Sequence, residues 1–192
     1  MYIKKLVWLI VILITSQFIL AQDRPEMEFD FFYTVANISG DVYPDPYGGR
    51  SGGGFEFGIG NQYKGLIGTY FTTPMDDKAN TKYEGMFSAY FGVSYLPDKF
   101  KYNPLIKIYW SFISLYQSYP EDYSSDYESD FGSIYEITGT SIGFSVGYQH
   151  MFNSYFGIGA NALINFNNYK DGDDSGGGTE YMVRIPEIVV KF

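Results

Sequence analysis

The chain has 192 residues, a formal net charge of −9, no cysteine and many aromatic residues, with 20 Tyr and 17 Phe. A chain this acidic is poorly suited to nucleic acid, because phosphate contacts require clustered Lys and Arg. The absence of cysteine excludes disulfides and a lipid anchor on cysteine. The length suits a single domain.

The N-terminus has the pattern of a secretory signal peptide. Lys4 and Lys5 precede the apolar run Leu6–Ile14, and the small residue Ala21 offers a cleavage point. The run is shorter than the roughly 20 residues of a spanning helix, which favours a cleaved signal over an uncleaved anchor.

We therefore predict a signal peptide over residues 1–21 and a mature domain over residues 22–192. The signal contains two Lys and no acid, so the mature net charge becomes −9 − 2 = −11.

From Glu28 to Phe192, eight segments rich in aromatic and β-branched residues alternate with polar connections. The connections are long and short in turn. The long ones are Ser39–Gly54, Pro74–Lys82, Ser118–Ser133 and Asn167–Thr179, and the short ones are Asn61–Tyr63, Leu96–Asn103 and Gln149–Ser154. Short turns at one end, long loops at the other and an even strand number are typical of outer-membrane barrels. We predict an all-β fold, an eight-stranded antiparallel up-and-down transmembrane β-barrel.

Within most segments apolar residues alternate with small or polar ones, which is the period of a strand. The clearest examples are Ser141–Tyr148 and Tyr155–Phe166. In Lys64–Thr73 both faces are apolar, so the pattern leaves open which of them faces lipid.

The fifth segment, Leu105–Tyr116, is ambiguous. The preceding Asn103 and Pro104 could open a helix, whereas the alternation of β-branched and aromatic residues favours a strand. Seven strands would leave an open edge in lipid, so we predict a strand.

The last segment, Tyr181–Phe192, contains Pro186, which has no N–H for a ladder. We predict a β-bulge at this residue. Counting back from Phe192 in steps of two places Met182 and Arg184 on the lipid face, where the Arg184 head would reach lipid phosphates.

The Ala-Gln signal end, the glycine-punctuated strand Thr140–Tyr148 and the terminal Phe192 resemble small outer-membrane β-barrel proteins of Bacteroidota-type bacteria, grouped with OmpA- and OmpX-like barrels. The resemblance covers the whole mature chain. It implies that the barrel-assembly machinery reads an assembly signal at Ile188, Val190 and Phe192. Arg184 departs from the usual apolar run of such a last strand.

The sequence gives little support to an enzyme. The single His, His150, falls in the predicted turn Gln149–Ser154, away from the rim where outer-leaflet enzymes work, and we interpret it as a surface residue. The chemistries of such enzymes need a general base beside a nucleophile, or a pair of carboxylates. The chain has no Gly-x-Ser-x-Gly, no His residues at metal-ligand spacing and no Cys. We predict no catalytic residue and no cofactor.

One loop partly matches a calcium site. The run from Asp171 to Gly176 fits the first half of an Asp-x-Asp-x-Ser-Gly loop, but its twelfth position is Met182 and not Glu. We interpret it as a solvated loop, with Asp171, Asp173 and Ser175 as weak metal candidates.

The inward-facing positions of the predicted strands gather charged residues. They are Asp30, Glu56, Glu84, Lys107 and Glu187. Eight strands leave an interior that side chains just fill, so we predict a hydrogen-bonded plug and not an open pore.

Together these features predict a monomeric, non-enzymatic protein of the cell outer membrane that acts through its surface loops or in membrane integrity. The expected partners are outer-membrane lipid and lipopolysaccharide, the barrel-assembly machinery and an unidentified surface ligand. A narrow cation-preferring channel is the main alternative, and a soluble lipocalin-type barrel is a third.

Overall fold

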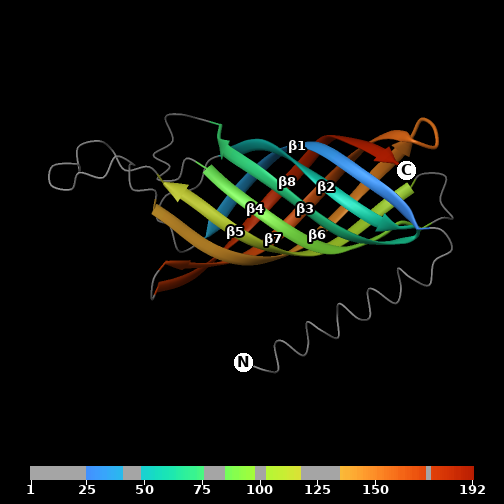
Figure 1. Cartoon of the computed structure of the whole chain (residues 1–192). Coiled ribbons are helices and arrows are strands. Elements are labelled where there is room, and N and C mark those ends of the chain that lie inside the picture. Colours follow the sequence, from blue (N-terminus) through green and yellow to red (C-terminus); the bar gives the residue numbers. More distant parts are fainter. Residues whose placement is uncertain (1–24, 41–48, 76–84, 98–102, 118–134, 172–173) are drawn as a thin grey trace, which may run out of the picture.

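Eight antiparallel strands close into a barrel in the computed structural model of the chain (Figure 1). The structure describes residues 25–40, 49–75, 85–97, 103–117, 135–171 and 174–192. The strands are β1 Glu26–Gly40, β2 Gly49–Gly60, β3 Tyr63–Pro74, β4 Gly85–Tyr95, β5 Asn103–Gln117, β6 Tyr135–Met151, β7 Phe156–Asp171 and β8 Asp174–Lys191. The predicted signal peptide lies outside the described residues.

Each strand pairs with its neighbours in the chain, and β1 pairs with β8 to close the sheet. Closure removes the free edges that would otherwise expose unpaired backbone groups. The predicted fold class is confirmed, and β5 is a strand and not a helix. Among the described residues, no helix has the length and apolar character needed to cross a membrane.

The two ends of the barrel differ. What we call the turn end has the connections 61–62, 96–102 and 152–155, and the C-terminus lies beside them (Figure 1). The opposite end, the loop end, has the connections 41–48, 75–84, 118–134 and 172–173. The first three of these correspond to predicted long loops.

The prediction of a fourth long loop, Asn167–Thr179, is wrong. β7 and β8 continue through this polar, Gly-rich sequence, and Asp171 pairs with Asp174. Likewise Gly49–Gly54 belongs to β2 and not to a loop. These segments have low strand propensity, but hydrogen bonds from a neighbouring strand on each side outweigh propensity.

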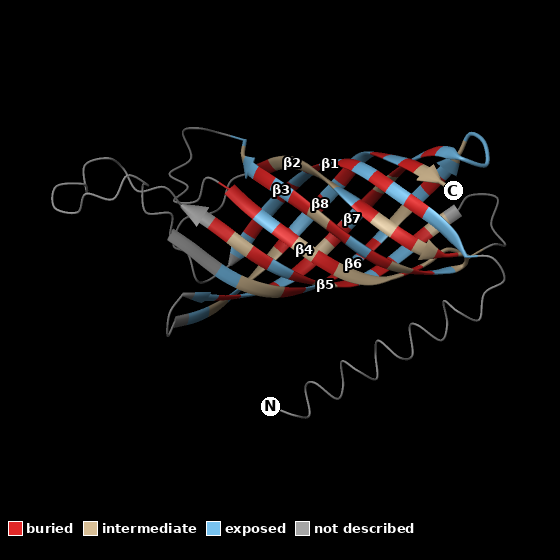
Figure 2. Cartoon of the chain, viewed as in Figure 1, coloured by how far each residue is buried: buried red, intermediate tan, exposed pale blue. Residues whose placement is uncertain are grey.

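Buried and more exposed residues alternate along most of each strand (Figure 2). Large apolar residues such as Phe31, Ile67 and Val146 are exposed on the outside, Val146 to 62%. The sequence left open which face of β3 points outwards. In the structure Ile67 and Phe71 are exposed on the outside, while Leu66 and Tyr70 are buried in the lumen. The outer surface is therefore largely apolar, whereas the lumen holds buried charged residues together with a cluster of buried apolar and tyrosine side chains.

Glycines make room for tyrosine rings inside the lumen. A Cβ atom at Gly143 would lie 2.2 Å from Cε2 of Tyr109, and one at Gly68 would lie 2.5 Å from the Tyr90 hydroxyl. Tyr109 and Tyr90 are themselves in contact, with ring centroids 5.2 Å apart. The alternation of glycine and large residues across neighbouring strands fills the narrow interior.

The predicted bulge in β8 is confirmed. Glu187 pairs with Phe32 and Arg184 with Thr34, so two residues of β8, Ile185 and Pro186, stand opposite one residue of β1. The same shift occurs against β7. Ile185 and Pro186 are both exposed, and the one extra residue shifts the alternation of faces by one position.

Candidate functional site

The candidate site is a network of charged side chains that fills the middle of the lumen. Its centre is the ammonium of Lys107 on β5, which is 1% exposed. Lys107 Nζ lies 2.7 Å from Glu56 Oε1, 3.1 Å from Glu187 Oε1 and 3.7 Å from Asp30 Oδ2. Strands β1, β2 and β8 supply the carboxylates, so the network ties together strands far apart in sequence.

Arg184 extends this network towards the loop end. Its Nη1 donates to Tyr90 OH at 3.1 Å and lies 3.4 Å from Glu56 Oε2, and Tyr90 OH donates to the same Glu56 oxygen at 2.9 Å. The guanidinium also lies over the Phe32 ring, 4.1 Å from its centroid, a favourable cation–π geometry. Arg184 thus joins the Lys107 network to Tyr90 and Phe32 inside the lumen.

The placement of Arg184 on the lipid face was therefore wrong, and so was that of Met182. Arg184 is fully buried, at 0% exposed. The bulge at Ile185 and Pro186 shifts the alternation, so residues before it no longer share a face with Ile188 and Val190. The sequence analysis predicted the bulge but continued the two-residue alternation from Phe192 through it without a shift.

The other predicted lumen residues behave as follows. Asp30, Glu56, Lys107 and Glu187 are buried and adjacent, as their positions in the strands predicted. Glu84 lies outside the described residues. Asn161 of β7 also lies in the lumen, and its amide Nδ2 donates to Glu187.

Ion pairs also line the turn end of the lumen. Lys64 binds Glu28, and both side chains are buried. Lys191 Nζ lies 3.5 Å from the same Glu28 carboxylate and 3.6 Å from Glu26. These pairs continue the polar chain from the Lys107 network to the rim.

A separate polar group occupies the loop half of the lumen. Glu180 of β8 accepts from Tyr70 OH at 3.1 Å and from Asn165 Nδ2 at 2.6 Å. Arg50 of β2 donates from Nε to Thr72 Oγ1 at 3.3 Å. Arg50 falls in the predicted loop Ser39–Gly54, and Glu180 lies between the predicted loop Asn167–Thr179 and the predicted strand from Tyr181, so neither was given a lumen position.

A metal site at the centre would require Lys107 to leave. Carboxylate oxygens of Asp30, Glu56 and Glu187 lie within 4.8 Å of one another, close enough to bind one cation together. The Lys107 ammonium already lies between them and balances part of their charge.

The weak calcium candidates do not form an open loop. Asp171 ends β7, and Ser175 pairs with Lys170 in the β7–β8 ladder. Asp173 lies outside the described residues. A twelve-residue calcium loop cannot start here, because the sequence after Asp173 is an extended strand.

His150 belongs to the end of β6 and not to the turn itself, which spans 152–155. It is exposed at the turn end, and its Nδ1 lies 3.4 Å from Tyr148 OH. This agrees with its interpretation as a surface residue.

The last strand ends with its apolar residues on the outside. Ile188 and Phe192 are exposed, and the Phe192 backbone N–H donates to Met27 O at 2.8 Å. The Phe192 ring packs against Phe29 of β1, with centroids 6.0 Å apart. This arrangement is compatible with an assembly signal at Ile188, Val190 and Phe192, which stays a prediction.

The fold is that of the small eight-stranded β-barrels found among outer-membrane proteins. Among solved structures the chain is similar to Neisserial surface protein A (NspA), with a TM-score of 0.64 and 11% identity over 88% of this chain and 100% of that one. It is also similar to the outer membrane protein OprG from Pseudomonas aeruginosa, with a TM-score of 0.51 and 9% identity over 88% of this chain and 95% of that one. At such identities the likeness extends to the fold alone. No family model matches the chain, and no curated protein matches it in sequence.

Proposed function

We propose that this protein is an integral barrel of the outer membrane with a closed lumen, and that it acts without enzymatic activity, through its loop end or by supporting membrane integrity. The outer surface favours this placement. Exposed Phe, Ile and Val side chains cover the middle of the strands, while Tyr63 and Tyr95 stack at the turn end, with centroids 4.9 Å apart. An apolar band bordered by aromatic residues suits hydrocarbon bordered by headgroups.

The observation on which the proposal rests is the Lys107 network. Because Lys107, Arg184 and three carboxylates pair across the centre, ions would have to displace strongly bound side chains to pass. A closed lumen leaves the outer surface and the loop end as the parts that can meet a partner.

The proposed partners are outer-membrane lipid and lipopolysaccharide around the barrel, the barrel-assembly machinery during insertion, and an unidentified ligand at the loop end. The protein acts as a monomer in this proposal. The resemblance to Bacteroidota-type barrels remains part of the proposal, since the similar solved structures come from other bacteria.

Membrane placement is tested by expressing the full chain in a Gram-negative host and washing the membranes with carbonate. We expect the protein to stay in the pellet and to show a heat-dependent gel shift. Release by carbonate without detergent contradicts the placement.

A closed lumen is tested in planar bilayers, where we expect no steady conductance. A cation-preferring channel is the second candidate, favoured by one observation. Among the described residues, the buried hydroxyls of Ser88, Tyr109, Ser111 and Ser141 have no hydrogen-bond partner within the protein, so water could hydrate this part of the lumen. Reproducible cation-selective steps from the unaltered protein, lost in Glu56→Gln, would establish the channel instead.

A further inference from the structure

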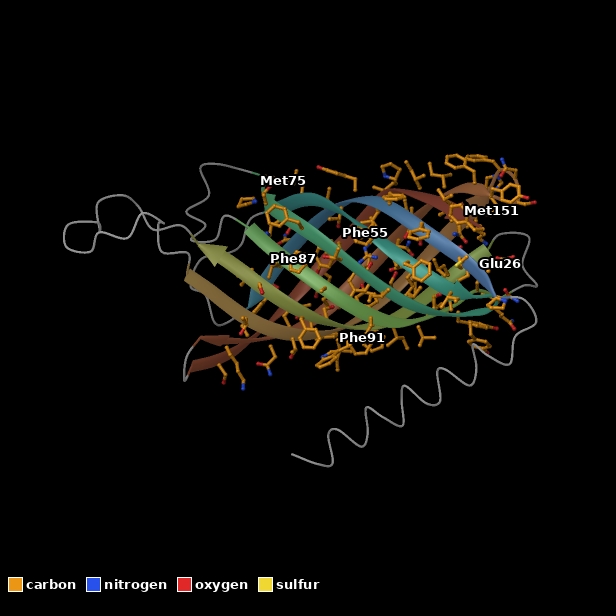
Figure 3. The ribbon with its side chains drawn as sticks, viewed as in Figure 1. Glu26, Phe55, Met75, Phe87, Phe91 and Met151 are labelled. Atoms are coloured by element: carbon orange, nitrogen blue, oxygen red, sulfur yellow. The ribbon has the colours of Figure 1, made fainter. Side chains whose placement is uncertain are left out.

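The lumen between the Lys107 network and the loop end, which Met75 marks in Figure 3, contains a belt of buried polar atoms that have no hydrogen-bond partner within the protein. Among the described residues, this polar belt comprises Nε and Nη2 of Arg184, Oε1 of Glu180, Oδ1 of Asn165 and Asn167, and the hydroxyls of Tyr109, Ser111 and Ser141. Even Asn167, the most exposed of these residues, is only 5% exposed. Because burial removes the hydrogen bonds that water gave these atoms in the unfolded chain, their clustering requires a physical reason.

The strand register places most of the polar belt in two adjacent rows of the wall. One row consists of directly paired residues on β8, β7, β6 and β5, which are Glu180, Asn165, Gly143 and Tyr109. The next row towards the loop end consists of directly paired residues on β7, β6 and β5, which are Asn167, Ser141 and Ser111. Directly paired residues have Cβ atoms about 4.5–5.5 Å apart, so the belt is continuous.

The polar belt carries a positive and a negative group beside the same tyrosine ring. The Cζ atom of Arg184 is 5.8 Å from the centroid of the Tyr70 ring and 5.8 Å from that of Tyr109. The Tyr70 hydroxyl donates to Glu180 Oε2 at 3.1 Å, while Glu180 Oε1 has no partner within the protein. Unpaired N–H groups and an unpaired carboxylate oxygen therefore both lie next to Tyr70.

This mixture of groups sets the chemistry of an occupant. The Arg184 guanidinium only donates, an ionised Glu180 only accepts, and the hydroxyls of Tyr109 and Ser111 do both. A cation would be repelled by Arg184, and an anion would be repelled by Glu180. The occupant must therefore be small, uncharged and able both to donate and to accept. Water has this chemistry, and a buried water typically makes about three hydrogen bonds to such groups.

The inward-facing residues of β5 show how the polar belt is enclosed. From the turn end to the loop end they include Lys107, Tyr109, Ser111, Ile113 and Leu115, all of them buried. Lys107 belongs to the charged network, whereas Ile113 and Leu115 belong to a buried apolar cluster. The belt thus lies between a charged layer and an apolar layer. The short side chains of Ser111 and Ser141, which are directly paired, leave room for water between these layers.

We propose that the polar belt holds a cluster of ordered water molecules that links Arg184 to Glu180 and is sealed from both ends of the barrel. The proposal rests on the closed lumen of the proposed function. Its consequence is that closure depends on the Lys107 network and on the apolar layer of Ile113 and Leu115, because the belt between them is already hydrated.

Removal of single hydroxyls from the full chain tests the proposal by the sign of the effect. If the Tyr109 hydroxyl bonds to water, Tyr109→Phe breaks that bond and should lower the urea midpoint of the refolded barrel. In a dry belt the same change removes an unsatisfied polar group and raises the midpoint. Tyr90→Phe is the matched control, because the Tyr90 hydroxyl is bonded to Glu56 and Arg184 and its loss should lower the midpoint in either case.

A second pair of variants keeps the test independent of the tyrosine ring. Ser111→Ala should lower the midpoint about as much as Ser145→Ala, whose hydroxyl donates to Asn161 Oδ1 at 3.3 Å inside the protein. A midpoint raised by Ser111→Ala and lowered by Ser145→Ala overturns the proposal. Should Tyr109→Phe give no heat-shifted folded band, the serine pair supplies the sign.

A crystal structure of the full chain, at a resolution that shows ordered water, identifies the occupant. We expect water within hydrogen-bonding distance of Arg184 Nη2 and Glu180 Oε1. A direct hydrogen bond between Arg184 and Glu180 in a dry belt overturns the proposal. A metal ion bound by the Glu180 and Asn165 oxygens, recognised by its anomalous scattering, overturns the assignment to water.

Failure of the water cluster can be told apart from failure of the closed lumen. Midpoints raised by both Tyr109→Phe and Ser111→Ala, in a barrel that does not conduct, refute the water cluster alone. Steady conductance of the unaltered protein in planar bilayers refutes the closed lumen and, with it, the seal around the polar belt.

Discussion

Lys107→Met should destabilise the barrel strongly, because it removes the cation on which three carboxylates converge. The side chain lies 2.7 Å from Glu56, 3.1 Å from Glu187 and 3.7 Å from Asp30, and it is buried. Methionine has a similar length without the charge, so packing changes little. The variant isolates the electrostatic contribution.

The magnitude follows from the distances. The facing carboxylate oxygens lie within 4.8 Å of one another, so each ionised pair would repel by about 3.5 kcal/mol at an effective dielectric constant of about 20. The folded protein can relieve this by protonating a carboxylate, and Arg184 still lies 3.4 Å from Glu56. We therefore expect a loss of about 3–5 kcal/mol in the free energy of unfolding, the range for breaking a buried ion pair.

The assay is urea unfolding of protein refolded in lipid vesicles, followed by the heat-dependent gel shift. Lys64→Met is the matched control. Lys64 is equally buried, but its partner Glu28 keeps Lys191 at 3.5 Å, so its loss should be less than half as large. The Lys107→Met loss should shrink in acid, where protonated carboxylates no longer repel.

An unfolding free energy for Lys107→Met within about 1 kcal/mol of the unaltered protein at neutral pH would refute this reasoning. So would equal losses in Lys107→Met and Lys64→Met. Either result would mean that the central ions are compensated by groups other than the observed pairs.

Three further predictions concern the outer surface, the lumen packing and the loop end. Ala162→Arg places a charge on the apolar band and should cost about 2–4 kcal/mol in lipid unfolding experiments; no loss would contradict the lipid-facing assignment. Gly143→Ala puts a methyl group 2.2 Å from the Tyr109 ring and should cost about 1–3 kcal/mol. Gly177→Ala should be tolerated, because the nearest atom to the added methyl group is 3.5 Å away. Equal losses of unfolding free energy in the two variants would show that Gly143 is not needed to make room for the Tyr109 ring. Replacing Ser118–Ser133 with a short Gly-Ser turn should preserve the heat-dependent gel shift but abolish the surface phenotype of the protein, as deletion of the whole protein would. A barrel that fails to assemble would make this segment structural.

The sequence by itself determined the number of strands, their order and most of their faces. Alternation is a local property, since each strand needs apolar residues on one side and polar or small ones on the other. In β6 this pattern placed Ile142 and Phe144 outside and Ser141 and Ser145 inside, as the structure has them. Asp30, Glu56, Lys107 and Glu187 were found in the lumen by the same reasoning.

The ends of the strands were harder to predict from the sequence than their middles. Gly52 and Gly177 lie in segments whose composition indicates loops, yet both belong to β-ladders. Hydrogen bonds from neighbouring strands hold such residues extended, and those neighbours are distant in the chain. Arg50 was missed as a lumen residue for this reason, and Glu180, directly after the predicted loop Asn167–Thr179, was assigned to neither a loop nor a strand.

Only the tertiary structure decided how the charges pair. The bulge at Pro186 could be anticipated, but the side of the wall on which Arg184 lies depends on where the ladder regains its register against β1 and β7. The partners of Lys107 come from three other strands, and their distances follow from the stagger of the closed sheet.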